Sequence, residues 1–312
     1  MENLFPRCSG DIAPAYQTSM GAMYLGKAEE ILGTYQDAWK KTVSLVLTSP
    51  PFPLNRKKRY GNLQGDEYLR WLASFSTPLK DLLRPDGSIV IELGNAWEPG
   101  KPVMSLLSLR ALLAFVEAGD LFLNEEFVCY NPARLPSPAQ WVTVERSRVK
   151  DAFTHIWWMA PSDRPKANNR NVLVPYSKSM EELLKKGTYN AGKRPSEHHI
   201  SPDTFLRSNG GAIPSNVLIA ANTASRDAYR EYCAQHGLSV HPARMAEKVV
   251  DFFIRLLTEE GDVVLDLFAG SNTTGAIAEK LGRRWISIEA DSDYVEGSKG
   301  RFPHSKVVAS TL

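Results

Sequence analysis

A five-residue segment, Thr48-Ser49-Pro50-Pro51-Phe52, carries groups that could hold the amino group of a nucleic-acid base. The Ser49 hydroxyl oxygen and the Pro50 carbonyl oxygen can both accept hydrogen bonds from an exocyclic NH2 group. The Phe52 ring can stack on the base that carries this amino group. Because a Ser-Pro-Pro tripeptide is also a common surface turn, its place in the fold must decide between the two interpretations.

A second set of chemically suited residues lies in the last sixty residues of the chain. Asp266 ends the apolar run DVVLD and precedes a turn of small residues, in which Gly270 lets the backbone approach a ligand. Glu289 ends the next apolar run, where an acidic side chain can accept hydrogen bonds from ribose hydroxyl groups. The turn lacks the GxGxxG spacing that cradles a pyrophosphate, which favours a ligand with an adenosine and an amino acid, such as S-adenosylmethionine. A structural turn or another nucleotide site is the alternative.

The elements that must position these residues follow an alternating pattern. Between residues 20 and 94, short apolar runs predict strands and amphipathic segments predict helices, in the order MYLG, AEEILGTYQDAWKK, SLVLTSPPF, DEYLRWLASFSTPLKDLL and SIVIELG. This alternation predicts an α/β fold with a mostly parallel sheet and helices on both faces. Two prolines cannot extend a central strand, so the chain must leave the sheet after Thr48, at the carboxyl edge where such sheets bind ligands.

The second half of the chain repeats this organisation. Residues 243–257, ARMAEKVVDFFIRLL, have helical periodicity, and Gly261 separates them from the expected strand DVVLDLF. Residues 121–160 are rich in aromatic and β-branched side chains (FLNEEFVCYN, WVTVERSR, FTHIWWMA), so we expect a terminal hairpin or edge strands there.

Together these motifs resemble the β group of amino-methylating DNA methyltransferases, in which the catalytic (S/N/D)PP(Y/F) motif precedes the cofactor motif. Two further segments are similar to that family's motifs, HPARMAEK at 241–248 and DLFAGSNTTG at 266–275, and the resemblance extends from about Tyr24 to Arg301. Serine at the first catalytic position resembles the N4-cytosine branch rather than the adenine enzymes. The resemblance implies a Rossmann-like methyltransferase fold in permuted order, with S-adenosylmethionine as cofactor and double-stranded DNA as partner.

The same resemblance implies a reaction and a set of site residues. The methyl group passes directly to the N4 amino group of a flipped-out cytosine, as in the modification enzymes of restriction-modification systems. The implied catalytic residues are Ser49, Pro50, Pro51 and Phe52. The implied cofactor-binding residues are Arg244, Asp266, Phe268, Ala269, Gly270, Ser271, Asn272, Thr273 and Glu289.

The chain departs from the family pattern in the cofactor motifs. Asn272 stands in a GSGT-like turn and Leu267 in a DPF-like one, and we expect both to leave the backbone path intact. Lys27 stands where the family commonly has an Asp that contacts the adenine ring. Because an ammonium group cannot accept that hydrogen bond, we assign Lys27 no role.

Contacts to DNA are expected from three segments. Trp157 and Trp158 fall where the family lines its base pocket, although adjacent strand residues face opposite sides and both could be core residues. The run Arg56-Lys57-Lys58-Arg59 could reach phosphates beside the flipped nucleotide, or could simply be solvated. Residues 161–210 carry nine basic and five acidic side chains with little regular pattern. We therefore expect a catalytic domain formed by 1–160 and 241–312, with a target-recognition region at 161–240.

Composition limits the remaining function classes. The chain has 312 residues, 43% of them hydrophobic, and a net charge of +2, which excludes a disordered or collagen-like protein and places any polyanion binding on local patches. The three cysteines, Cys8, Cys129 and Cys233, are widely spaced, so we expect neither a disulfide framework nor a metal site. The sequence shows no secretory leader or membrane segment, so we expect a bacterial cytoplasmic protein that acts at the nucleoid.

Carbon-5 cytosine methylation is excluded, because its thiolate nucleophile follows a proline and none of the three cysteines here does.

Three other functions stay open. N6-adenine methylation uses the same pocket chemistry, and a non-catalytic DNA-binding relic would keep the same fold. An RNA or protein-glutamine methyltransferase fits the motif order and the basic segment less well. We expect a monomer that acts on each strand in turn.

Overall fold

The computed structural model describes residues 12–52, 63–188, 192–193, 199–200, 206–221, 227–303 and 307–309. Its strands are β1 (Tyr16–Gln17), β2 (Gly21–Leu25), β3 (Val43–Thr48), β4 (Leu83–Gly94), β5 (Phe122–Tyr130), β6 (Phe153–Ala160), β7 (Gly192–Lys193), β8 (His199–Ile200), β9 (Val217–Ile219), β10 (Val263–Asp266), β11 (Arg284–Glu289) and β12 (Val308–Ala309). Its α-helices are α1 (Ala28–Trp39), α2 (Gly65–Ser74), α3 (Ser76–Leu82), α4 (Leu107–Gly119), α5 (Lys178–Lys186), α6 (Ala228–His236), α7 (Glu247–Leu257), α8 (Thr273–Lys280) and α9 (Ser292–Ser298).

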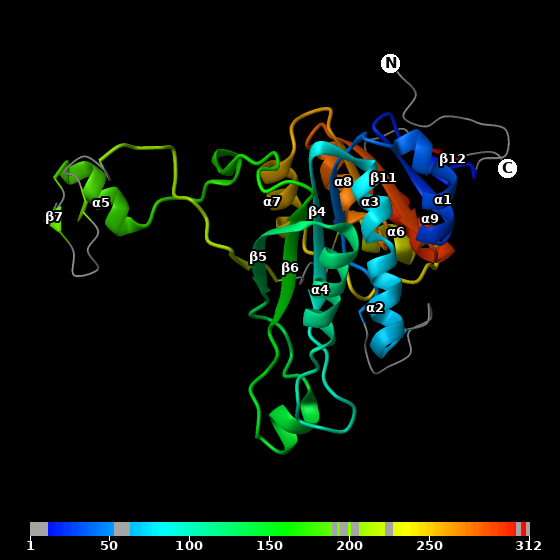
Figure 1. Ribbon diagram of the computed structural model, residues 1–312, viewed down its shortest axis with the longest axis horizontal. Helices are drawn as coiled ribbons and strands as arrows, with labels where there is room; N and C mark the ends of the chain where they lie inside the picture. The colour runs from blue at the N-terminus through cyan, green and yellow to red at the C-terminus, as the bar shows by residue number, and fades with distance from the viewer. Residues whose placement is uncertain are drawn as a thin grey trace. The chain divides into compact units, whose positions relative to one another are not determined.

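In the described part of the chain, ten strands form one sheet in the order β12-β1-β2-β11-β10-β3-β4-β6-β5-β9. Its five central strands, from β2 to β4, are all parallel. Strands β10 and β11, from the end of the chain, lie between β2 and β3, from its beginning (Figure 1). This arrangement confirms the predicted α/β fold with a mostly parallel sheet, and it brings the two ends of the chain together in one sheet.

Helices cover both faces of this sheet because its central strands are apolar on both sides. Along β3 and β4, Val46, Ile89 and Ile91 belong to the core formed with α1, α2, α3 and α4. The alternate residues Leu45 and Val90 are equally buried but point to the opposite face, where α7 packs against β3 and β4. Figure 1 shows α2, α3 and α4 side by side on one face.

The segment 121–160 supplies the expected antiparallel hairpin. Strand β6 lies between β4 and β5 and is antiparallel to both. The segment WVTVERSR is not a strand, because Gln140–Val144 form a π-helical turn (η1) within the connection between β5 and β6. Tertiary context outweighs the β-propensity of these residues.

The chain divides into two compact units, residues 1–167 with 216–312, and residues 168–215. The second unit contains α5, whose N-terminus is capped by Ser177 Oγ accepting from the Met180 amide, and a short β7–β8 ladder. Residues 216–240, expected in the target-recognition region, belong to the first unit. No helix among the described residues is long and apolar enough to span a membrane.

Candidate active site

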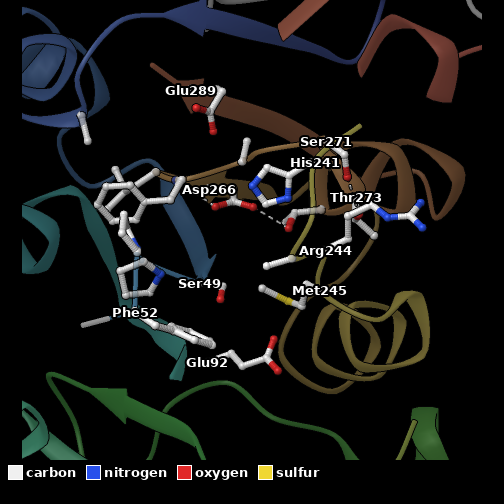
Figure 2. Close-up of a pocket in the computed structure, with 18 of the residues that line it drawn as sticks. Ser49, Phe52, Glu92, His241, Arg244, Met245, Asp266, Ser271, Thr273 and Glu289 are labelled. Carbon is white, nitrogen blue, oxygen red and sulfur yellow. Dashed lines mark hydrogen bonds between the residues drawn. The ribbon is translucent and has the colours of Figure 1, made fainter. Parts of the chain in front are cut away.

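The carboxyl ends of the parallel strands meet at a cavity of about 1060 Å³. Because β2, β11, β10, β3 and β4 run in one direction, the residues that follow them lie at one edge of the sheet. Ser49, Phe52, Asp266 and Glu289 all line this cavity (Figure 2). This volume lies at the upper end of the range typical for ligand pockets, about 300–1,000 Å³, and is large enough for a nucleoside cofactor.

Asp266 joins the two predicted motifs at the centre of the cavity. Its carboxylate accepts hydrogen bonds from Thr48 Oγ1 and Thr274 Oγ1, at 2.7 Å each, and from the Phe268 amide at 3.1 Å. Burial raises the pKa of Asp266 above the ordinary aspartate value, although these three donors oppose the shift. The Thr48 bond ties the strand that leads into Ser49 directly to the turn after β10.

The turn after β10 is shaped by left-handed backbone at two residues. Gly270 has φ +51°, and a Cβ there would lie 3.0 Å from the His241 ring. Asn272 has φ +55° and caps α8, its Oδ1 accepting from the Gly275 amide at 3.1 Å. The same side chain accepts from Ser287 Oγ and donates to Tyr16 Oη. Asparagine tolerates this conformation better than most residues, which explains how it replaces the glycine of the family pattern.

Glu289 organises the backbone that surrounds the expected nucleoside. Its Oε2 accepts from the Gly270 amide at 2.7 Å, and its Oε1 accepts from the amides of Ala290 and Asp291 at 2.9 Å each. Burial raises the pKa of Glu289, and the three amide donors counter part of this rise. The carboxylate therefore fixes both turns, and it lines the cavity where a ribose hydroxyl could also donate to it.

The Ser49-Pro50-Pro51-Phe52 turn forms the opposite part of the cavity. Ser49 and Phe52 are half-buried, and Pro50 is buried. The Phe52 ring packs on Gly94 at the end of β4, where an added Cβ would lie only 2.6 Å from the ring. In the view of Figure 2, Ser49 lies between Asp266 and Glu92.

The cofactor side of the cavity suits a nucleoside with an amino acid. Phe268 lies 5.5 Å from the Trp71 ring centre and 5.6 Å from that of Phe75, so it is held in an aromatic cluster at the cavity wall. Peptide and hydroxyl groups of Ala269, Ser271 and Thr273 also line it. Within the described residues no group of three His, Cys, Asp or Glu side chains could hold a metal ion.

Residues 43–300 match the family model described as DNA methylase, N6_N4_Mtase. The chain belongs to this DNA methylase family. It is 44% identical to the type II methyltransferase M.PvuII of Proteus hauseri, over 93% of this chain and 85% of that protein. It is 25% identical to the type II methyltransferase M.BamHI of Bacillus amyloliquefaciens, over 89% of this chain and 56% of that protein.

Solved structures agree with this membership. The PvuII DNA methyltransferase (cytosine-N4-specific) superimposes with a TM-score of 0.75 at 38% identity, covering 94% of this chain and 89% of that one. The M1.HpyAVI–SAM complex, at 19% identity and a TM-score of 0.52, shares the fold over 91% of this chain and all of that one. The chain is therefore a DNA methyltransferase.

Two residues that were expected to line the base pocket, Trp157 and Trp158, lie outside the lining of the cavity. Trp157 is 1% exposed and belongs to the core, and Trp158 donates from Nε1 to Ser88 Oγ at 2.9 Å. Neither lines the cavity, because β6 turns both rings into packed surroundings and brings Thr154 to the site instead. Arg56, Lys57, Lys58 and Arg59 lie outside the described residues.

Two basic residues are held by acidic partners. Arg244 lines the cavity, but its guanidinium forms an ion pair with Asp227 and lies 5.6 Å from the centre of the Tyr229 ring. Lys166, counted in the basic segment, pairs with Asp262 and Glu259 of the first unit at 2.8 and 2.9 Å. Lys166 therefore contributes to the packing of this unit rather than to a free basic surface.

Lys27, to which no role is assigned, lies at the exposed rim of the cavity. Its side chain is 73% exposed, and its nearest acidic partner is Glu30 at 3.9 Å. Glu29 lines the cavity beside it, although its Oε1 accepts from Trp71 Nε1 at 2.6 Å. Asp291 also lines the cavity and caps α9.

The sequence alone did not indicate five residues that form one wall of the cavity together with Glu92. They are Cys129, Asn131, Arg134, Thr154 and Met245. The acidic end of the run SIVIE was the only available signal, because the other residues come from strands and loops whose pairing cannot be deduced from spacing.

Proposed function

We propose that this chain transfers a methyl group from S-adenosylmethionine to the N4 amino group of cytosine in double-stranded DNA. The observation that carries the proposal is the shared cavity, in which the Ser49-Pro50-Pro51-Phe52 turn faces the Asp266 turn across the Thr48–Asp266 hydrogen bond. A base and a nucleoside cofactor bound to the two turns would be neighbours. The PvuII methyltransferase, similar over nearly the whole chain, carries the same specificity in its name.

Direct methyl transfer depends mainly on how the protein positions the cytosine amino group relative to the methyl group of the cofactor. The cofactor supplies an electrophilic methyl group on a sulfonium. The Ser49 hydroxyl and the Pro50 carbonyl accept hydrogen bonds from the N4 amino group and orient its lone pair, while Phe52 stacks on the ring. Pro51 holds the turn that presents them. The target atom cannot reach this depth inside a duplex, so the cytosine is flipped out at a cost of a few kcal/mol.

The cofactor lies on the other side of Asp266. The turn Phe268-Ala269-Gly270-Ser271-Asn272-Thr273 lets the cofactor approach the backbone, and Glu289 is placed to accept from its ribose. Arg244 lines the cavity, and its ion pair with Asp227 holds its side chain in place. The Arg56–Arg59 run and the unit at 168–215 contact the duplex around the flipped base. The enzyme acts as a cytoplasmic monomer and modifies DNA in a restriction-modification system.

Product analysis tests this function. The purified protein would be incubated with tritiated S-adenosylmethionine and unmethylated genomic DNA, followed by nucleoside digestion and mass spectrometry. We expect label in N4-methylcytosine. Label in N6-methyladenine would contradict the choice of base, and DNA without label would contradict the DNA methyltransferase activity itself.

A further inference from the structure

Glu92 lies beside Ser49 because of the register between two parallel strands. Thr48 of β3 pairs with Ile91 of β4, so Ser49 and Glu92 are the next residues along neighbouring strands. Both line the cavity, and Figure 2 shows the Glu92 carboxylate turned toward its interior below Ser49. A carboxylate is thus held beside the residue expected to bind the reacting amino group.

The surroundings of Glu92 leave one carboxylate oxygen available. Thr154 Oγ1, from β6, donates to Oε1 at 2.8 Å. No other side-chain hydrogen bond to Glu92 is formed within the described ranges, so Oε2 keeps its lone pairs for a ligand. By contrast, both oxygens of Asp266 and both of Glu289 accept hydrogen bonds from the protein.

Few charged groups face this carboxylate. Cys129, from β5, lines the same cavity, and the pKa of its thiol is raised to about 11 by burial and by Glu92. Arg134, in the loop after β5, is a cation that acts electrostatically on Glu92 and favours its ionised form. Ser49 of the β3 end and Thr154 of β6 do not titrate in the accessible pH range. Lys248 of α7 acts electrostatically on Cys129.

Methyl transfer to an amino group requires a proton acceptor at the nitrogen. Attack by N4 leaves that nitrogen with a methyl group, two hydrogens and a positive charge. A neutral serine hydroxyl and a proline carbonyl can accept hydrogen bonds, but neither is basic enough to keep the proton. A buried carboxylate with a free oxygen is suited to this role.

We propose that Glu92 is a catalytic residue that accepts the proton leaving N4 of the target cytosine, a role that rests on the proposed N4-cytosine activity. The N4 lone pair forms a bond to the methyl carbon, and the carbon–sulfur bond breaks with its electron pair staying on sulfur as a neutral thioether. The electron pair of one N4–H bond returns to nitrogen as its proton passes to Glu92 Oε2. The products are neutral N4-methylcytosine and a neutral Glu92 carboxyl group, which releases its proton to solvent before the next turnover.

The ionisation of Glu92 agrees with this assignment. Burial raises its pKa above the ordinary glutamate value, and the Thr154 hydrogen bond and Arg134 counter part of that rise. A raised pKa makes the ionised carboxylate a stronger base. The methylation rate should therefore increase as pH rises through this pKa and then level off.

The test compares Glu92→Gln and Glu92→Asp with the intact protein in single-turnover methylation of unmethylated genomic DNA, with N4-methylcytosine quantified by mass spectrometry between pH 5 and 9. Glu125→Gln, the same change at an exposed residue of β5, is the matched control. Affinity for S-adenosylmethionine is measured for every variant. We expect Glu92→Gln to lower the rate at least 100-fold, to lose the rise with pH, and to bind the cofactor normally. Glu92→Asp should keep a reduced rate that still rises with pH, and Glu125→Gln should match the intact protein.

Specific outcomes would overturn the assignment. A Glu92→Gln rate within threefold of the intact protein would show that Glu92 does not take the proton. A rate in the intact protein that falls with rising pH would indicate a protonated Glu92 donating to the base. Loss of cofactor binding in both Glu92 variants would make Glu92 a structural residue. If the intact protein forms N4-methylcytosine in these cases, only the role of Glu92 fails; if it forms none, the proposed function fails as well.

Discussion

At the scale of single residues, three carboxyl groups in one cavity differ in what they can still bind. Burial raises the pKa of Glu92, Asp266 and Glu289 alike. Asp266 and Glu289 each accept three hydrogen bonds from the protein, so their main effect is to hold turns in place. Glu92 accepts one from Thr154, which leaves it able to react with a substrate.

Ser49 is expected to act on the rate of methyl transfer and not on cofactor binding. Removing its hydroxyl in Ser49→Ala deletes one acceptor for an amino group that becomes positively charged. A hydrogen bond to a charged group is worth about 1.5–3 kcal/mol, which corresponds to a loss of about 10- to 160-fold in kcat. Tritium transfer to DNA and cofactor titration would measure the two effects. The exposed Ser74→Ala is the control, and an unchanged kcat in Ser49→Ala would remove Ser49 from the site.

Glu92 is also expected to destabilise the folded protein at high pH. Because its folded-state pKa lies above the unfolded value, its contribution to stability is greatest at acid pH and is lost as pH rises through the folded-state pKa. Glu92→Gln keeps an acceptor for Thr154 without the charge. We expect its Tm to exceed that of the intact protein at pH 8.5, with the difference shrinking toward pH 5. Thermal unfolding at both pH values measures this, and equal differences at the two would show that Glu92 does not titrate with a raised pKa.

At the scale of elements, the turn after β10 is held in place by hydrogen bonds between residues that lie far apart in sequence. Asn272 begins α8, yet it also bonds Ser287 of β11 and Tyr16 of β1. Gly275 must lack a side chain, because a Cβ there would lie 2.3 Å from Asn272 Oδ1. The turn after β10 is therefore stabilised from three elements at once.

Substitutions of Asn272 should separate its backbone conformation from its hydrogen bonds. Asn272→Ala loses the cap and the buried bonds and places alanine at positive φ, so we expect a loss of about 2–4 kcal/mol in the free energy of unfolding. Asn272→Gly permits the conformation and should cost less, about 1–2 kcal/mol. Urea denaturation measures both. Equal losses in the two variants would mean that the left-handed conformation contributes nothing to the free-energy difference between them.

The parts of this site that the sequence could predict are those encoded locally. Asp266 and Glu289 end short apolar strands and Gly270 lies in the turn after one of them, so their positions at one edge follow from parallel strand direction alone. The wall formed by Thr154 and Cys129 could not be predicted, because it depends on the antiparallel register of β6 between β4 and β5. The packing of the two tryptophans away from the cavity could not be predicted for the same reason, since neighbouring strand residues offer no signal of which side is packed.

At the scale of the whole molecule, the charge available for DNA is local because the net charge is only +2. Within the second unit, the described side chains Arg170, Lys178, Lys185, Lys186 and Arg207 outnumber Glu181 and Glu182. The run from Arg56 to Arg59 adds four charges shortly after the Ser49-Pro50-Pro51-Phe52 turn in sequence. Both segments are proposed to bind phosphates, whereas Lys166 is neutralised by its acidic partners.

The salt dependence of DNA binding measures how many of these charges meet phosphates. Each phosphate contact adds about 0.9 to the slope of log K against log salt, so replacing Arg56, Lys57, Lys58 and Arg59 with Gln should reduce the slope by up to about 3.6 and weaken binding at low salt. The matched control replaces four cations that precede the parallel strands, at the opposite edge of the sheet: Lys40, Lys41, Arg255 and Lys280. That variant loses the same net charge, so it should bind DNA more weakly only through the long-range field and should keep its slope. Equal slopes in the two variants would show that the run after the catalytic turn makes no phosphate contacts, and binding would then depend on the unit at 168–215.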